Sequence, residues 1–217
     1  TTYSLVSMEI ADLHVEKVSA TVARPFIIEH HYSGSCHNGP MAWGCFHDDT
    51  LVGVVAFATP ISENVRKSIW ADPFKEEMKH HTTELHRLVT LDETPHNTES
   101  WFISRGLSAL KRYKPKYKAV ISFADPMEGH QGTIYQASNA IYYGTTGGSL
   151  AFVKPDGTTR HRRRGGENLA KADGIEQGLI PERRDSKHRY LFLTPDPYES
   201  KADIRAKLDI DEQPYPS

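Results

Sequence analysis

Short apolar runs separated by turn-forming residues dominate the first half of the chain. Apolar positions alternate with polar ones over residues 13–18, and two apolar runs, residues 41–47 and 51–58, are joined by a three-residue polar turn. Alternation with a period of two is typical of a strand, and two runs around a short turn predict an antiparallel hairpin. Residues 20–32 show the spacing of an amphipathic helix, in which Pro25 is tolerated best in the first turn.

The second half alternates between strand and helix patterns. Residues 84–91 and 117–124 have strand patterns, and helical spacing runs through residues 101–113 after Thr98, a good N-cap residue. Weaker patterns predict a short helix over residues 130–139 and strands over residues 140–143, 149–153 and 189–193. Prolines after residue 194 predict a tail that is extended or disordered.

This order of elements predicts an α+β fold, a mixed and mostly antiparallel sheet flanked by helices. A hairpin followed by strand, loop and helix is the arrangement of GNAT-like acyltransferases, although other α+β folds share it. We divide the chain into a catalytic core (residues 1–150), a basic C-terminal extension that completes the domain (residues 151–193) and an acidic, proline-containing tail (residues 194–217).

Charge is distributed unevenly along the 217 residues, although the net charge is only −2. Residues 154–190 hold ten Lys/Arg and six Asp/Glu, a local +4, whereas the chain from residue 194 onward holds three and six, a local −3. A contact with DNA is therefore expected in the first segment. The absence of long apolar runs, of a signal-peptide pattern and of more than two cysteines predicts a cytoplasmic protein with no membrane partner.

Six short motifs stand in order within residues 26–144. They are HHYS (30–33), GVVAF (53–57), ELHRL (84–88), NTESWFI (97–103), SFADP (122–126) and GHQGTIYQASN (129–139). Together these motifs resemble the Mom family of phage DNA-modification proteins. The resemblance implies a GNAT-like fold and an acetyl-CoA-dependent conversion of adenine in DNA to a carbamoylmethylated, N6-modified base. It also implies protection of DNA from restriction and, for a phage protein, a place in the host cytoplasm.

The resemblance implies that Arg87 and Ser100 serve acyl-CoA binding or activity. An arginine fork can pair with phosphate, and a serine in the first turn of a helix lies among backbone N–H groups that attract anions. A surface ion pair and a helix cap are the alternatives. Residues 94–99 lack the glycines and arginines of the usual pyrophosphate loop and end at the acidic Glu99. The predicted cofactor-binding residues are Arg87, Leu88, Val89, Asn97, Thr98, Ser100, Ser138 and Asn139.

The resemblance further implies iron, for which His31, Tyr32, Asp125 and Tyr135 are the predicted ligands. Imidazole, carboxylate and phenolate suit non-haem iron. The alternatives are an Asp-Pro turn and tyrosines that only fill the core. Tyr135 is also a candidate general acid for the departing CoA thiolate. The predicted catalytic residues are Tyr32, Arg87, Ser100, Asp125 and Tyr135.

A run of arginines followed by glycines suits contacts with phosphates of double-stranded DNA. Its members are Arg160, Arg162, Arg163 and Arg164. Chemistry on a paired adenine requires base flipping, and Trp43, Trp70 or Tyr142 are candidates to stack on the flipped base. Asn139 could read an adenine edge, although a capping role is simpler.

Three functions remain open from the sequence: a DNA adenine modifier, an ordinary GNAT acetyltransferase acting on a small amine or a protein, and a non-catalytic DNA-binding anti-defence protein. The first requires that the end of strand 117–124 meets the end of helix 20–32 in one pocket. The oligomeric state is open, and a homodimer is one alternative.

Overall fold

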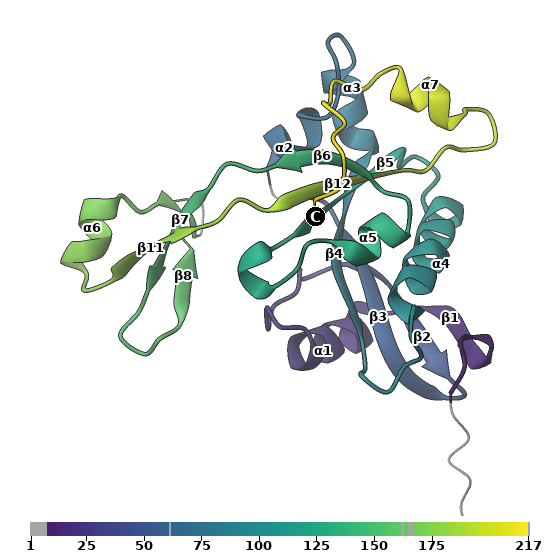
Figure 1. The fold of residues 1–217 in the computed structure, drawn as a ribbon, viewed down its shortest axis with the longest axis horizontal. Coiled ribbons are helices and arrows are strands. Elements are labelled where there is room, and N and C mark those ends of the chain that lie inside the picture. The colour runs from purple at the N-terminus through teal and green to yellow at the C-terminus, as the bar shows by residue number, and fades with distance from the viewer. Residues whose placement is uncertain (1–7, 61, 162, 165–166, 217) are drawn as a thin grey trace, which may run out of the picture.

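The computed structural model describes residues 8–60, 62–161, 163–164 and 167–216 (Figure 1). The helices are η1 (Ile10–Asp12), α1 (Ala20–His30), α2 (Glu63–Lys67), α3 (Lys75–Met78), η2 (Lys79–His81), α4 (Thr98–Tyr113), η3 (Pro126–Glu128), α5 (Thr133–Ala137), α6 (Lys171–Glu176) and α7 (Lys201–Arg205). The strands are β1 (Leu13–Val18), β2 (Met41–His47), β3 (Thr50–Ala58), β4 (Thr82–Thr90), β5 (Ala119–Ala124), β6 (Ile141–Thr145), β7 (Ser149–Val153), β8 (Thr159–His161), β9 (Arg163–Arg164), β10 (Glu167–Asn168), β11 (Ile180–Arg184) and β12 (His188–Leu193).

Seven strands form the main sheet in the order β1-β2-β3-β4-β5-β12-β6. Neighbouring strands are antiparallel except β4 and β5, which run parallel. Strand β12 returns from late in the chain to lie between β5 and β6, with Leu191 opposite Ile121. The predicted α+β fold with a mixed, mostly antiparallel sheet is confirmed.

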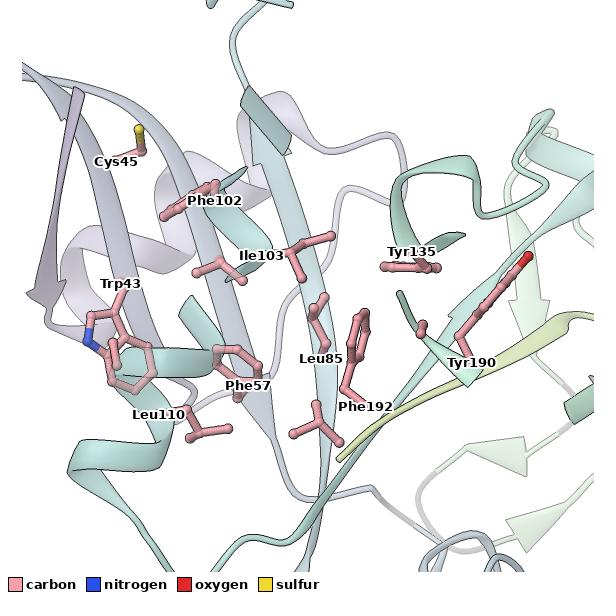
Figure 2. Packing of buried hydrophobic residues seen from close by; sticks show 14 of the residues in the cluster. Trp43, Cys45, Phe57, Leu85, Phe102, Ile103, Leu110, Tyr135, Tyr190 and Phe192 are labelled. Carbon is pink, nitrogen blue, oxygen red and sulfur yellow. The ribbon is translucent and has the colours of Figure 1, made fainter. Parts of the chain in front are cut away.

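Helix α4 covers one face of this sheet and α1 covers the other. Because side chains alternate across a strand, Val55 and Phe57 pack beneath α4, whereas Val54 and Ala56 pack against α1. Figure 2 shows Phe57 in the first layer, close to Leu110 of α4. This two-sided burial fixes the strand register, since a slip by one residue would exchange the two layers.

The C-terminal segment packs on the α1 face, farther along the sheet. Ile204 of α7 is fully buried in a cluster with Trp70 of the excursion between β3 and β4 and with Leu191 of β12. Farther on, the backbone N–H of Gln213 donates to the Tyr142 carbonyl. The prediction of an extended or disordered tail is therefore wrong for the helical part, because its apolar side chains complete a core layer.

A three-stranded sheet, β11-β7-β8, projects from the core as an arm, and α6 packs against it (Figure 1). Phe152 of β7 is fully buried beneath Gly174 of α6, where a Cβ atom would lie 2.2 Å from the phenyl ring. The arm leaves the core after β6 and rejoins it at β12. Within the described residues, no helix is long and apolar enough to cross a membrane.

Some local details differ from the sequence expectations. Asn97, with a left-handed backbone (φ 69°), is the N-cap of α4, and Thr98 is the first helical residue, its hydroxyl donating to the Pro95 carbonyl. Pro25 lies inside α1 and does not end it. The polar stretch before β4 contains the short helices α2, α3 and η2 rather than only irregular chain.

Candidate active site

Strands β4 and β5 diverge in the middle of the sheet. They pair only from Thr82 to Glu84 of β4, and His86 is an extra residue in the pairing of β4 with β3, since Arg87 and Leu85 face consecutive residues of β3. Such a bulge bends a strand and re-aims its side chains. In the described chain, the later part of β4 therefore has no strand partner on its β5 side. The Leu85 and His86 carbonyls accept from the side chains of Ser122 and Arg87, so the backbone groups that a ligand can reach lie beyond them, within residues 87–90.

A pocket of about 520 Å³ opens at this divergence. The end of α1, the second half of β4, the tip of β5 and the start of α5 supply its wall. All four predicted metal-site residues, His31, Tyr32, Asp125 and Tyr135, line it. The structure thus brings the end of α1 to the tip of β5, as the sequence-based hypothesis requires.

Asp125 is held by two cations from the base of the arm. Its carboxylate lies 3.0 Å from Lys187 Nζ and 3.5 Å from Arg184, and it accepts a hydrogen bond from the Met127 N–H. The Asp125 side chain is 5% exposed. Burial works against its charged form, but the hydrogen bond and charge of Lys187, with Met127 and Arg184, outweigh burial and lower the pKa of Asp125.

Tyr135 lies on the inner wall and packs against Tyr190 and Phe192 of β12 (Figure 2). Burial raises the pKa of Tyr135 to about 12, although a hydrogen bond with Ser122 opposes the shift. The phenol therefore keeps its proton at neutral pH.

His31 ends α1 as its C-cap, and its ring is neutral. Burial, followed by the charge of Arg87, lowers the pKa of His31 to about 4. The Ser33 backbone N–H donates to Nδ1 at 3.1 Å, so the proton of the neutral ring is on Nε2. Arg87 itself holds the loop after α1, because its Nε donates to the Ser35 carbonyl at 2.9 Å.

Tyr32 is the exposed aromatic residue at the mouth of this pocket. It is 55% exposed, and its ring contacts those of His31, with centroids 4.3 Å apart, and His130, with centroids 5.0 Å apart. Burial of the phenol and the nearby Asp125 charge raise the pKa of Tyr32. The exposed part of the neutral Tyr32 side chain can therefore contact a planar ligand at the mouth, beside the two imidazole rings.

Comparisons with known proteins identify the family of this chain. The model of the Mom protein family matches residues 12–217. The chain belongs to the Mom protein family. The methylcarbamoylase Mom of Escherichia phage Mu is 31% identical over 213 residues, which cover 94% of this chain and 84% of that protein. The expectation of an enzyme with an acyltransferase-like fold is thereby confirmed.

Solved acetyltransferases match over most of the chain at low similarity. An N-acetyltransferase from Staphylococcus aureus Mu50 has 9% identity and a TM-score of 0.46, covering 84% of this chain and 97% of that one. A putative acetyltransferase from Salmonella typhimurium, solved with acetyl-CoA, has 8% identity and a TM-score of 0.47, covering 85% and 95%. We infer nothing further from these matches.

The predicted cofactor residues of this Mom-family chain divide into two groups. Arg87, Leu88 and Val89 line the pocket, and the wall continues through Thr90 to Glu99 at the start of α4. The others are outside its wall: Asn97, Thr98, Ser100, Ser138 and Asn139. The Ser100 hydroxyl donates to the Asn97 carbonyl at 3.1 Å, which is a local helix contact.

The four predicted iron ligands share one pocket but, as arranged, they do not fit an iron centre. Asp125 is occupied by Lys187 and Arg184, and both tyrosines favour the protonated phenol. A histidine ligand usually donates its second ring N–H to an acceptor, whereas His31 Nδ1 faces a donor. Among the described residues, no group of three or more His, Cys, Asp or Glu is placed to share a metal ion.

Only one of the described DNA-contact candidates lies on a strand of the arm. Arg160 lies on β8, whereas Arg163 and Arg164 form β9, which pairs with β10 in a separate two-stranded sheet, and Arg162 is outside the described residues. At the base of the arm, Arg184 is paired with Asp125, Glu128 and Glu182. The candidates for base stacking are not available in this pocket: Trp43, Trp70 and Tyr142 are 4%, 0% and 6% exposed.

Sequence reasoning missed several polar residues of the pocket. Glu84 lies 3.6 Å from Nδ1 of His86, and the buried Nε2 of His86 has no hydrogen-bond partner in the described chain. Residues two apart on a strand share a face, so the Glu-x-His spacing was a usable signal. Lys187 had no local signal, because β12 brings it to Asp125 from far along the chain.

Proposed function

We propose that this Mom-family chain converts adenine in DNA to an N6-carbamoylmethylated base. Acetyl-CoA would supply the two carbons, an ammonia-equivalent amine donor would supply the amide nitrogen as the CoA thiolate leaves, and a two-electron oxidant would accept the electrons of the methyl C–H bond that is replaced by the bond to N6. The observation that carries the proposal is the pocket where the unpaired edge of β4, the tip of β5 and the end of α1 meet. Family membership supports the reaction, since the phage Mu relative is named a methylcarbamoylase. The same pocket offers both a strand edge for a thioester and an aromatic mouth for a base.

The acyl-CoA is proposed to lie along β4 from Arg87 toward the start of α4. Its amide groups would pair with the open backbone groups of β4, as an added strand does. The pyrophosphate would then reach the N-terminus of α4, where free backbone N–H groups favour anions. Glu99 lies on this path and opposes the phosphates, so binding is weaker than the helix end alone would allow.

Tyr135 is proposed to donate a hydrogen bond to the sulfur of the thioester as it departs. Full proton transfer from a phenol of pKa about 12 to a thiolate whose thiol has a pKa of about 8.5 is uphill by roughly 5 kcal/mol. A hydrogen bond that strengthens as charge builds on sulfur avoids this cost. Its role is therefore closer to charge stabilisation than to that of a general acid.

The target adenine is proposed to enter at the mouth of the pocket beside Tyr32. This exposed ring replaces the buried tryptophans as the stacking surface for a flipped base. The arm, with Arg160 on β8, and the β9 residues Arg163 and Arg164 that follow β8 would contact phosphates of the duplex. Replacing these arginines by glutamine should weaken DNA binding and flatten its salt dependence in a shift assay, and unchanged binding would exclude the arm.

The proposed reaction contains no step on iron, and metal analysis of the purified protein tests whether the chain binds it. If Asp125 exchanges Lys187 and Arg184 for a metal, Tyr32 and Tyr135 would be the neighbouring oxygen donors. A bound iron would supply redox chemistry and Lewis acidity at the mouth of the pocket.

The deciding experiment is mass spectrometry of nucleosides from plasmid DNA after expression of the chain. We expect an adenine nucleoside carrying the carbamoylmethyl group, its loss in Tyr135→Phe, and its retention in the matched control Tyr198→Phe, whose ring is 96% exposed on the tail. Unmodified adenine from cells that contain the folded protein would contradict the proposal. Acetylated small amines in the same lysate would favour an ordinary acetyltransferase instead.

A further inference from the structure

A second cavity, of about 330 Å³, lies between β1 and α4, away from the pocket described above. We call it the β1–α4 groove. Its wall consists of Leu13, His14, Val15 and Lys17 of β1, Trp43 of β2, and Trp101, Arg105, Ala109 and Arg112 of α4. It shares no residue with the wall of the first pocket.

Three unneutralised cations line this groove. In the described part of the chain, Lys17, Arg105 and Arg112 have no carboxylate partner, although Lys17 lies 3.9 Å above the Tyr113 ring and Arg105 lies 5.6 Å from the Trp101 ring. The two arginines are seven residues apart on α4, which is about 10.5 Å along one helix face. Their long side chains can therefore converge on a single anion from positions two turns apart.

The surroundings leave this positive charge uncompensated. The sequence contains no Asp or Glu between Glu99 and Asp125. Glu16, which is well exposed, approaches the groove residue His14 at 3.8 Å and none of the three cations. Cations near a helix C-terminus are often explained by the helix dipole, but that reason does not extend to Arg105 in mid-helix or to Lys17 on a strand.

Trp43 supplies a hydrogen-bond donor to the same groove. Its ring is 4% exposed and wedged at the edge of the core, yet no described residue accepts a hydrogen bond from its indole N–H. Figure 2 shows the nitrogen on the side of the ring turned away from Phe57 and Leu110. This nitrogen is not one of the buried side-chain atoms that lack a partner, so it opens onto the groove and can donate to an acceptor there.

We propose that the β1–α4 groove binds the phosphate group of a nucleotide. Phosphate accepts several charge-assisted hydrogen bonds, and arginine forks match its geometry. The indole N–H of Trp43 adds a neutral donor at the floor, and Trp101 at the wall gives the attached sugar and base an aromatic surface. The nucleotide is either a free mononucleotide or one nucleotide of a DNA strand, and the test separates these sources.

The test is quenching of tryptophan fluorescence in the full chain, because Trp43 and Trp101 line the groove whereas Trp70 is buried elsewhere. Titrations use AMP, inorganic phosphate and a short DNA duplex. Arg105→Gln and Arg112→Gln should each weaken the quenching constant about tenfold, the effect of losing one charge-assisted contact worth about 1.4 kcal/mol. Lys201→Gln, an exposed lysine on α7, is the matched control and should bind like the parent.

Each result decides the proposal. Quenching by AMP that depends on the arginines identifies a free nucleotide, and arginine-dependent quenching by the duplex alone identifies a nucleotide of DNA. The absence of quenching by both AMP and the duplex, whether or not inorganic phosphate quenches, overturns the proposal, and so do arginine variants that bind like Lys201→Gln. Trp43→Phe, checked for an unchanged fold by circular dichroism, should also weaken binding. If the chain binds nucleotide in the groove but produces no modified adenine in plasmid DNA, the proposed function is contradicted and the groove proposal stands.

Discussion

Asp125 and Lys187 form an ion pair but differ in solvent exposure. This difference predicts which of two substitutions lowers the free energy of unfolding more. Asp125 is 5% exposed, whereas Lys187 is 45% exposed. Lys187→Met leaves a buried carboxylate with only Arg184, at 3.5 Å, and the Met127 N–H. A buried charged group that loses one of its partners costs about 1–2 kcal/mol. Asp125→Asn returns a half-exposed lysine to water and keeps an acceptor for Met127, so we expect about 0.5 kcal/mol.

Urea unfolding at pH 7, followed by circular dichroism, measures both free energies of unfolding, with Lys201→Met as the control for loss of an exposed lysine. For a chain of this length the larger loss lowers Tm by about 3–6 °C. The folded pKa of Asp125 is depressed, so its stabilisation is complete above the unfolded value near 4 and is lost as pH falls through the folded value. The deficit of Lys187→Met should therefore shrink in acid. An Asp125→Asn loss equal to or larger than that of Lys187→Met would refute the reasoning.

Three further predictions concern the pocket. Glu99→Gln should tighten acetyl-CoA binding about two- to threefold at low salt, since it removes one exposed repulsion; calorimetry showing no gain would place the pyrophosphate elsewhere. Tyr135→Phe should lower kcat by roughly tenfold to a hundredfold with little change in KM for acetyl-CoA, since its hydrogen bond forms as sulfur gains charge; a change confined to KM would assign it to binding. If Asp125 binds iron, Lys187→Met should raise the iron content of purified protein and Asp125→Asn should abolish it, whereas equal iron in all three proteins would exclude Asp125 as a ligand.

Local patterns predicted most of the sheet, because the burial of one or both faces of a strand determines which of its own residues are apolar. The bounds of β1 and β7 agree with the predicted strands at residues 13–18 and 149–153, and the hairpin of β2 and β3 differs by one residue. The tail was harder, because its prolines suggest an open chain while Ile204 is buried only through contact with Trp70 and other distant residues. Tertiary packing overrides such local signals.

The candidate site likewise has a part that local motifs predicted and a part that depends on long-range contacts. The motifs placed Tyr32, Asp125 and Tyr135 in one pocket, because Tyr32 and Asp125 directly follow α1 and β5 and Tyr135 lies on the short helix after β5. The partners of these residues could not be predicted in the same way. Lys187 lies on the segment that leads from the arm into β12, and only the position of β12 beside β5 brings it to Asp125.

This long-range contact joins the arm to the pocket. Arg184 ends β11 of the arm and contacts both Asp125 and Glu128, and β12, which follows, carries Tyr190 against the Tyr135 ring. A phosphate that drew Arg184 away would weaken the charge pairing of Asp125 and leave Lys187 as its main counterion. DNA bound by the arm and a metal bound by Asp125 would therefore favour each other, since both require the carboxylate and the cations to separate. An iron content that rises when duplex DNA is present, and does not change with DNA in Arg184→Gln, is the signature of this coupling.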